Sequence, residues 1–172
     1  MLELIYNVGI DIVLAIQNLG NWLVTPMESV TFLGTEEFYL LLMPAIYWCI
    51  DTAVGMRVGL ILLASTSINT LFKWALHMPR PYWYSAPVDG MVAETGFGAP
   101  SGHSQIPSSI FGMIAVSIRR RWATVLLLTL IFLIGFSRLF LGAHFPHDVL
   151  IGWTLGGLLL WGFVKYEAPV KA

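Results

Sequence analysis

The chain alternates between long apolar stretches and short polar connections. The apolar stretches lie near residues 4–24, 34–51, 54–76, 104–119, 121–141 and 147–166. A helix needs about 20 apolar residues, within a range of roughly 17–25, to cross the hydrocarbon core of a bilayer. Because unpaired backbone groups are costly in lipid, crossing segments should be helical. The pattern therefore predicts an all-α fold, a polytopic membrane bundle of about six transmembrane helices that forms one domain over residues 1–172.

The first apolar stretch differs from the others because polar residues interrupt it. Asn7, Asp11, Gln17 and Asn18 make it amphipathic, so it either crosses the membrane or lies along the interface. The one long stretch without a helical pattern, about 77–103, is rich in Pro and Gly. We expect it to lie outside the hydrocarbon region.

Composition supports a membrane environment. Of the 172 residues, 57% are hydrophobic and only 11% are charged, whereas soluble domains carry roughly 25% charged residues. The net charge of −1 gives no reason to expect a nucleic acid partner. Cys49 is the single cysteine, so the chain forms no internal disulfide. Its oligomeric state is not apparent from these features.

The few polar residues at the ends of the predicted spans collect on one membrane face. Following the chain through six spans places these residues together: Lys73, Arg80, Ser101, Gly102, His103, Arg138, His144 and Asp148. The opposite face receives Arg57, Arg119, Arg120, Arg121, Lys165 and Lys171. Cytoplasmic loops are enriched in Lys and Arg. The pattern therefore predicts a multi-pass cell membrane protein with an extracytoplasmic site and, if all six segments cross, cytoplasmic termini.

Two cations, Lys73 and Arg80, are candidates for binding an anion. Arginine offers a planar fork to phosphate oxygens, and lysine adds a compact charge. Pro79 and Pro81 restrict the backbone on both sides of Arg80, and a bend near His77 would bring the two cations onto one anion. Either cation taken alone is also compatible with an interface anchor that extends to the lipid headgroups.

The segment 100–103, Pro-Ser-Gly-His, is predicted to open the fourth span. A helix N-terminus presents free N–H groups and a partial positive charge to an anion. Gly102 allows close approach of the backbone, and Ser101 can cap the helix or donate its hydroxyl. The alternative is an ordinary helix cap followed by a surface histidine, His103.

His144 and Asp148 are spaced four residues apart, so they share a face if the sixth helix begins near Ala143. A carboxylate on one imidazole nitrogen fixes the tautomer and frees the other nitrogen as a nucleophile. Arg138 precedes His144 by six residues at the end of the fifth span. A His–Asp pair that only closes a helix end is the alternative, and the residues alone do not decide whether His103 or His144 attacks.

The remaining polar residues of this face lack a comparable pattern. We interpret His77 and His147 as loop residues or supports of the site. Four carboxylates are expected to be solvated loop charges, namely Glu36, Glu37, Asp89 and Glu94. The histidines do not form a convincing ligand cluster, and three cations oppose a divalent ion, so no metal and no cofactor is expected.

Three motifs together resemble the signature of the type 2 phosphatidic acid phosphatase superfamily, which includes membrane lipid phosphatases and soluble vanadium haloperoxidases. The motifs are Lys73-x6-Arg80-Pro81, Pro100-Ser101-Gly102-His103 and Ser137-Arg138-x5-His144-x3-Asp148, and they keep order and spacing over residues 73–148. The resemblance implies a six-helix membrane core and metal-independent hydrolysis of a phosphate ester or diphosphate.

The resemblance also implies roles for the site residues. His144 is similar to the nucleophile that forms a phosphohistidine, with Asp148 orienting it. His103 is similar to the acid that protonates the leaving oxygen and then activates water. The cradle for the transition-state oxygens corresponds to Lys73, Arg80, Ser101, Gly102 and Arg138.

The apolar chain favours a lipid phosphate that enters from the bilayer, and the stretches 34–39 and 48–51 resemble sphingosine phosphate and polyprenyl diphosphate phosphatases within the superfamily. We rank a polyprenyl diphosphate, such as undecaprenyl diphosphate, narrowly above phosphatidic acid, phosphatidylglycerol phosphate or sphingosine phosphate. Two other hypotheses remain open. One is a phosphotransferase that uses the same residues, and the other is a lipid-headgroup binding or transport protein without catalysis.

Overall fold

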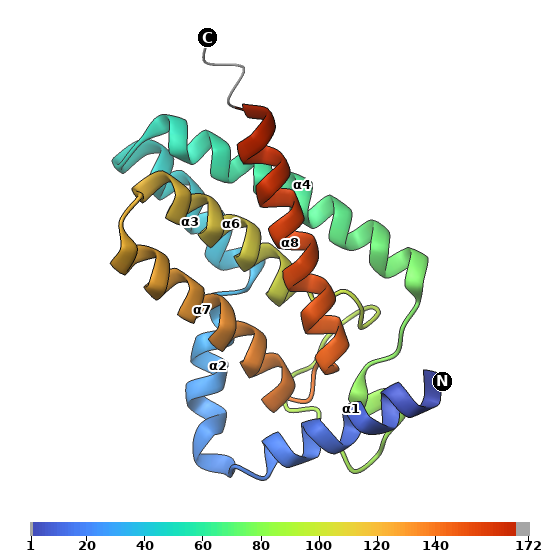
Figure 1. Cartoon of the computed structure of the whole chain (residues 1–172). Helices are drawn as coiled ribbons and strands as arrows, with labels where there is room; N and C mark the ends of the chain where they lie inside the picture. The colour runs from blue at the N-terminus through green and yellow to red at the C-terminus, as the bar shows by residue number, and fades with distance from the viewer. Residues whose placement is uncertain (1, 168–172) are drawn as a thin grey trace.

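A bundle of long helices is crossed at one end by the N-terminal helix (Figure 1). The computed structural model describes residues 2–167, and this part of the chain contains helices and connections but no strand. The elements are α1 (Leu2–Gln17), η1 (Asn21–Leu23), α2 (Val24–Phe32), α3 (Glu36–Cys49), α4 (Thr52–Leu76), α5 (Pro81–Tyr84), α6 (Gly102–Ile118), α7 (Arg121–Phe140) and α8 (Pro146–Glu167). The predicted all-α bundle is confirmed.

The first apolar stretch does not form the single helix predicted over 4–24. Helix α1 ends at Gln17, and the chain bends by 85° between Leu2–Gln17 and Asn21–Phe32. Gly20 lies in this bend with a φ of 112°, a backbone angle that glycine adopts without strain. Helix α1 packs against α5, α7 and α8 across the end of the bundle, as Figure 1 shows.

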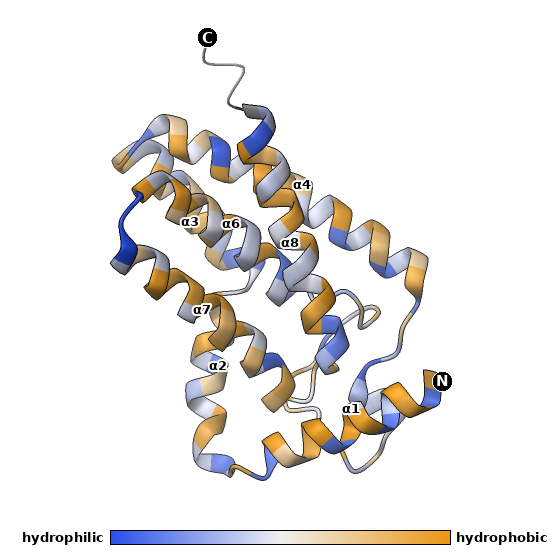
Figure 2. Cartoon of the chain, viewed as in Figure 1, coloured by the Kyte–Doolittle hydropathy of each residue, from blue (hydrophilic) through white to orange (hydrophobic). Residues whose placement is uncertain are grey.

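Three helical segments among the described residues are long and apolar enough to cross a membrane, namely Thr52–Tyr84, Arg121–Phe140 and Pro146–Tyr166. The bent pair of α1 and α2 adds a fourth if it counts as one span. Helices α3 and α6 are shorter, with 14 and 17 residues, so six is an approximate number. Figure 2 shows apolar residues recurring along these helices and a hydrophilic turn between α6 and α7.

Helix α6 forms the centre of the bundle and packs against α4, α7 and α8. Its buried residues include four polar ones, Ser104, Gln105, Ser108 and Ser109. These side chains face neighbouring helices, where small and polar groups permit close packing in a membrane protein. The polar content of α6 therefore reflects an interior position.

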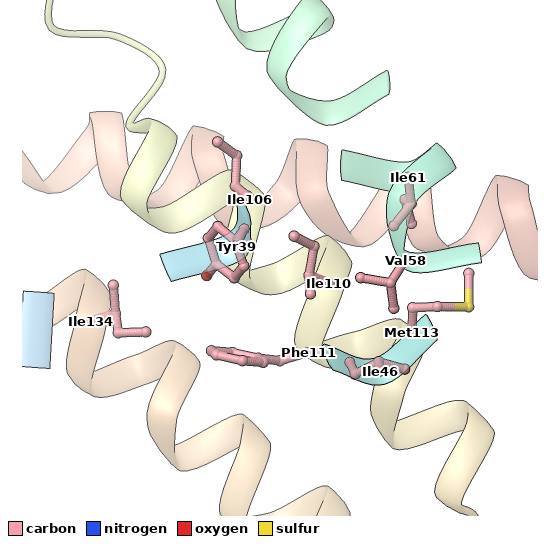
Figure 3. Packing of buried hydrophobic residues seen from close by; sticks show 9 residues of the cluster. All are labelled: Tyr39, Ile46, Val58, Ile61, Ile106, Ile110, Phe111, Met113 and Ile134. Atoms are coloured by element: carbon pink, nitrogen blue, oxygen red, sulfur yellow. The ribbon is translucent and has the colours of Figure 1, made fainter. Parts of the chain in front are cut away.

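Apolar side chains from α3, α4, α6 and α7 form the main core of the bundle. Figure 3 shows the cluster, whose members are Tyr39, Ile46, Val58, Ile61, Ile106, Ile110, Phe111, Met113 and Ile134. The aromatic rings of Tyr39 and Phe111 meet edge to face, with centroids 6.1 Å apart, a favourable geometry. This core fixes α6 between α4 and α7.

Two glycines of α8 bring that helix against α6. A Cβ atom on Gly152 would lie 2.7 Å from the carbonyl oxygen of Ser101, and one on Gly156 would lie 2.4 Å from that of Gln105. Both distances are too short for a real side chain, so this contact requires glycine. The spacing of four residues is the one by which membrane helices approach closely. The contact aligns the N-terminal ends of α6 and α8.

Candidate active site

Residues from three separated segments meet where α4 ends and α6 and α8 begin. A cavity of about 390 Å³ lies there, and its lining includes Lys73, Gly102, His103 and His144. Asn69 and Glu94 also line it, together with residues 34–37 between α2 and α3. The structure therefore brings the predicted motifs together at one end of the bundle.

His144 lies in the turn before α8, because that helix begins at Pro146 and not near Ala143 as the spacing suggested. The imidazole is almost fully buried. Its Nδ1 lies 3.3 Å from Oδ2 of Asp148, and its Nε2 lies 3.3 Å from Nη1 of Arg80. The pair forms even though His144 precedes the helix.

These contacts define the tautomer of His144. A guanidinium group only donates hydrogen bonds, so Nε2 accepts from Arg80 and the ring proton resides on Nδ1, which donates to Asp148. Burial, followed by the charges of Arg80, Arg138 and Lys73, holds the pKa of His144 well below its ordinary value of 6.5. The imidazole is therefore neutral at neutral pH, and Nε2 carries a lone pair.

Arg80 is held rigidly by backbone carbonyl groups. It caps the short helix α5 after the left-handed His77, at φ 50°, has ended α4. Its Nε donates to Gly96 at 2.9 Å, its Nη1 to Ala143 at 3.0 Å and its Nη2 to Phe97 at 3.3 Å. The predicted bend near His77 is present, and it places the guanidinium beside His144.

Arg138, a predicted site residue, pairs with a carboxylate that was not expected at the site, Glu94. Nη1 of Arg138 donates to Oγ1 of Thr31 at 2.8 Å, and Nη2 pairs with Glu94. The other carboxylate oxygen of Glu94 lies 3.7 Å from Nη2 of Arg80. Interpreting Glu94 as a solvated loop charge was therefore wrong. Its carboxylate bridges two arginines at the cavity wall, a position suited to a phosphate group.

Ser101, Gly102 and His103 lie where α6 begins, as predicted. Gly102 and His103 line the cavity. The hydroxyl of Ser101 is buried, makes no side-chain cap and accepts a hydrogen bond from Ser104 at 3.1 Å. The backbone N–H of Ser101 donates to the carbonyl of Asp148 at 3.1 Å. Ser101 therefore joins α6 to α8 in this structure.

A buried network of side-chain amides lies beside the cavity, and the sequence motifs did not predict it. Asn69 donates to Oε1 of Gln105 at 2.9 Å and to the carbonyl of Pro100 at 3.2 Å. Gln105 in turn donates to the carbonyl of Ser65 at 3.0 Å. A signal was available, because Asn69 lies one helical turn before Lys73 in an apolar helix, and polar residues there are usually functional.

The other candidates are placed around this centre. His77 is exposed, and the centroid of its ring lies 4.5 Å from that of Phe97. Glu36 and Glu37 are exposed at the cavity wall. Among the described residues, no group of three or more His, Cys, Asp or Glu side chains is arranged to hold a metal ion.

Fold and site together define a helical integral membrane protein with a His–Asp pair enclosed by cations. The chain belongs to the PAP2 superfamily, whose family model matches residues 54–170. The resemblance drawn from the motifs is confirmed.

Curated relatives and solved structures agree with this assignment. Human glucose-6-phosphatase 3 is 34% identical over 185 aligned positions, which cover 93% of this chain and 53% of the relative. Phosphatidylglycerophosphatase B of Bacillus subtilis is 31% identical over 163 positions, 87% of this chain and 78% of the relative. The chain therefore spans about half the length of the glucose-6-phosphatases it matches.

Two crystal structures share the fold. The transmembrane PAP2-type phosphatidylglycerolphosphate phosphatase of Bacillus subtilis has a TM-score of 0.84 and 25% identity, covering 95% of this chain and 86% of that one. Aquifex aeolicus LpxE has a TM-score of 0.83 and 21% identity, covering 91% and 94%. The similarity to LpxE supports only the assignment of the fold.

Proposed function

We propose that this chain is a membrane phosphatase that hydrolyses a lipid phosphate or diphosphate through a phosphohistidine on His144. The observation that carries the proposal is the state of His144. Its Nδ1 proton is directed to Asp148, its Nε2 lone pair is directed to Arg80, and its ring lines a cavity shared with Lys73 and His103. This arrangement suits nucleophilic attack on a bound phosphate.

The reaction has two steps. Nε2 of His144 attacks phosphorus to form a P–N bond while the P–O bond to the leaving group breaks. His103 takes up a proton from solvent when the phosphate anion binds beside it, and it gives that proton to the leaving oxygen. Neutral His103 then takes a proton from water, whose oxygen attacks phosphorus as the P–N bond breaks. Inorganic phosphate leaves and His144 is restored. Asp148 stabilises the charge that develops on the imidazole.

The cationic groups stabilise the oxygens of the transferring phosphoryl group. Arg80 and Arg138 offer planar forks, and Lys73 adds a charge at the cavity wall. Backbone N–H groups at Gly102 complement them at the start of α6. In the free protein Glu94 pairs with both arginines, so the substrate phosphate replaces this carboxylate when it binds.

A lipid substrate is favoured by the surface beside Lys73. Leu71, Phe72 and Trp74 are all exposed on the same helix, so the cation emerges at the edge of a lipid-facing surface. A polyprenyl diphosphate ranks first, and phosphatidylglycerol phosphate, on which the named Bacillus subtilis relative acts, is the next lipid. A water-soluble sugar phosphate is a second candidate, because the matching glucose-6-phosphatases act on one.

Phosphate release by purified protein in detergent tests the proposal, with EDTA present. The substrates are a polyprenyl diphosphate, phosphatidylglycerol phosphate, phosphatidic acid, sphingosine phosphate and glucose 6-phosphate. We expect release in EDTA from at least one lipid and its loss in His144→Ala. Folded protein that releases no phosphate, or a His144→Ala variant that remains active, contradicts the proposal. A product in which phosphate is passed to an added acceptor indicates a transferase.

The distribution of basic residues supports an extracytoplasmic site. Arg57 lies near the start of α4, and Arg119, Arg120 and Arg121 lie where α6 ends and α7 begins. The cavity is lined by residues near the opposite ends of α4 and α6, Lys73 and His103, and basic residues favour the cytoplasm. Cysteines introduced at Ala86 and Thr52 in a Cys49→Ser background test this orientation. A membrane-impermeant maleimide should label position 86 in intact cells and position 52 only after permeabilisation, and the reverse result refutes the orientation.

A further inference from the structure

The carboxyl group of Asp148 faces two histidines. Oδ2 accepts from the backbone N–H of Phe145 at 3.0 Å and from Nδ1 of His144. Oδ1 lies 3.2 Å from Nε2 of His147. The mechanism above uses only the first oxygen, so the second oxygen and His147 have no assigned role.

Both facing atoms lack another partner. Among the described residues, Oδ1 of Asp148 and Nε2 of His147 are both buried side-chain atoms without a well-aligned hydrogen bond. Leaving a buried polar atom without a hydrogen bond is destabilising. Because the two atoms lie at hydrogen-bonding distance from each other, a small rotation of the imidazole satisfies both. The geometry therefore indicates a pair between His147 and Asp148.

Aromatic side chains fix the orientation of His147. Its ring stacks on Phe145, with centroids 5.1 Å apart and an interplanar angle of 13°, and meets Tyr6 at 5.7 Å. Tyr6 in turn contacts Tyr84 at 4.9 Å. Tyr6 of α1 therefore covers the histidine, Tyr84 of α5 supports Tyr6, and the stack on Phe145 holds the ring near Asp148.

We infer that His147 is a positioning residue, which donates a hydrogen bond from Nε2 to Oδ1 of Asp148 and so holds the carboxylate for His144. This inference rests on the proposed function. Groups that orient a catalytic or ligating histidine through its carboxylate partner commonly change activity 10–100-fold when removed. His147 does not line the cavity and acts through Asp148 alone.

Two substitutions separate the hydrogen bond from the packing of the ring. His147→Phe keeps an aromatic ring against Phe145 and Tyr6 but removes the donor. His147→Gln places an amide N–H near the position of Nε2. We expect His147→Phe to lower kcat by about 10–100-fold with KM within threefold, and His147→Gln to remain within about fivefold of the wild-type kcat. If His147→Phe does not fold, His147→Leu replaces it.

A double-mutant cycle with Asp148→Ala distinguishes positioning from a structural role. Once the carboxylate is absent, His147→Phe should change the residual rate by less than about twofold. Rapid-quench measurement of phosphoenzyme formation should show the same dependence. The inference is overturned if His147→Phe retains wild-type kcat, if His147→Gln is as slow as His147→Phe, or if the effect persists without Asp148.

The wild type and His144→Ala, measured in parallel, keep the two proposals distinguishable. An active wild type with an inactive His144→Ala supports the phosphohistidine mechanism whatever His147 does. A wild type that releases no phosphate from any substrate instead refutes the proposed function, and with it the positioning role.

Discussion

Substituting Gly156 by alanine tests whether the α6–α8 contact positions the site. The added Cβ would lie 2.4 Å from the carbonyl oxygen of Gln105, against an ordinary contact of at least 3.4 Å, so the helices must separate by about 1 Å. Such overpacking costs roughly 1–3 kcal/mol, and the better helix propensity of alanine offsets about 0.5–1 kcal/mol. The expected net loss is about 1–2 kcal/mol.

Gly157 is the matched control, because a Cβ atom there has no neighbour within 4 Å. At about 2–4 °C per kcal/mol for a chain of this size, Gly156→Ala should lower the Tm in detergent by about 2–8 °C. Gly157→Ala should leave the Tm unchanged or raise it slightly. The separation also moves His103 relative to His144, so kcat should fall by about 10²-fold for Gly156→Ala alone. Equal effects of the two substitutions would refute the packing argument.

Three further predictions concern the charges around His144. Arg80→Lys keeps the charge but loses the guanidinium group that donates to three backbone carbonyls. We therefore expect kcat/KM to fall by about 10²–10³-fold, and a value within threefold of wild type would contradict this geometry. Glu94→Gln removes the carboxylate that pairs with Arg138 and Arg80. Orthovanadate should therefore bind and inhibit about tenfold more tightly, a gain of about 1.4 kcal/mol in binding free energy. Unchanged or weaker inhibition would contradict the displacement of Glu94 by phosphate. The pKa of His144 is lowered in the folded state. Above pH 6.5 the histidine is neutral in the folded and the unfolded chain, so it does not change the free energy of unfolding with pH. Below pH 6.5 the unfolded chain binds a proton that the folded chain excludes, so the free energy of unfolding falls with the pH. The Tm of wild type should therefore fall more steeply between pH 7.5 and 5 than that of His144→Gln, and parallel slopes would count against this linkage.

The fold class and the main candidate residues of the site could be predicted from the sequence. Apolar stretches of bilayer length leave few alternatives to helices, and the polar residues at their ends fall on one face by the connectivity of the chain. Lys73, His103 and His144 were therefore predicted to meet, and the structure places all three at one cavity.

The distribution of charges and hydrogen bonds among these residues depends on tertiary packing. Glu94 lies in a long irregular loop, where no periodicity predicts the direction of a side chain, and its pairing with two arginines depends on the path of that loop. The 85° bend after α1 likewise follows from packing across the bundle end.

The close approach of α6 and α8 has the same origin. A glycine at position 156 is visible in the sequence, but its partner is a carbonyl on a helix about 50 residues earlier. Contacts between distant segments depend on how the helices pack, whereas hydropathy and motif spacing are properties of the local chain. For this reason the motifs predicted the cations and histidines of the site, whereas the packing of the helices determined their partners, the tautomer of His144 and the position of His147.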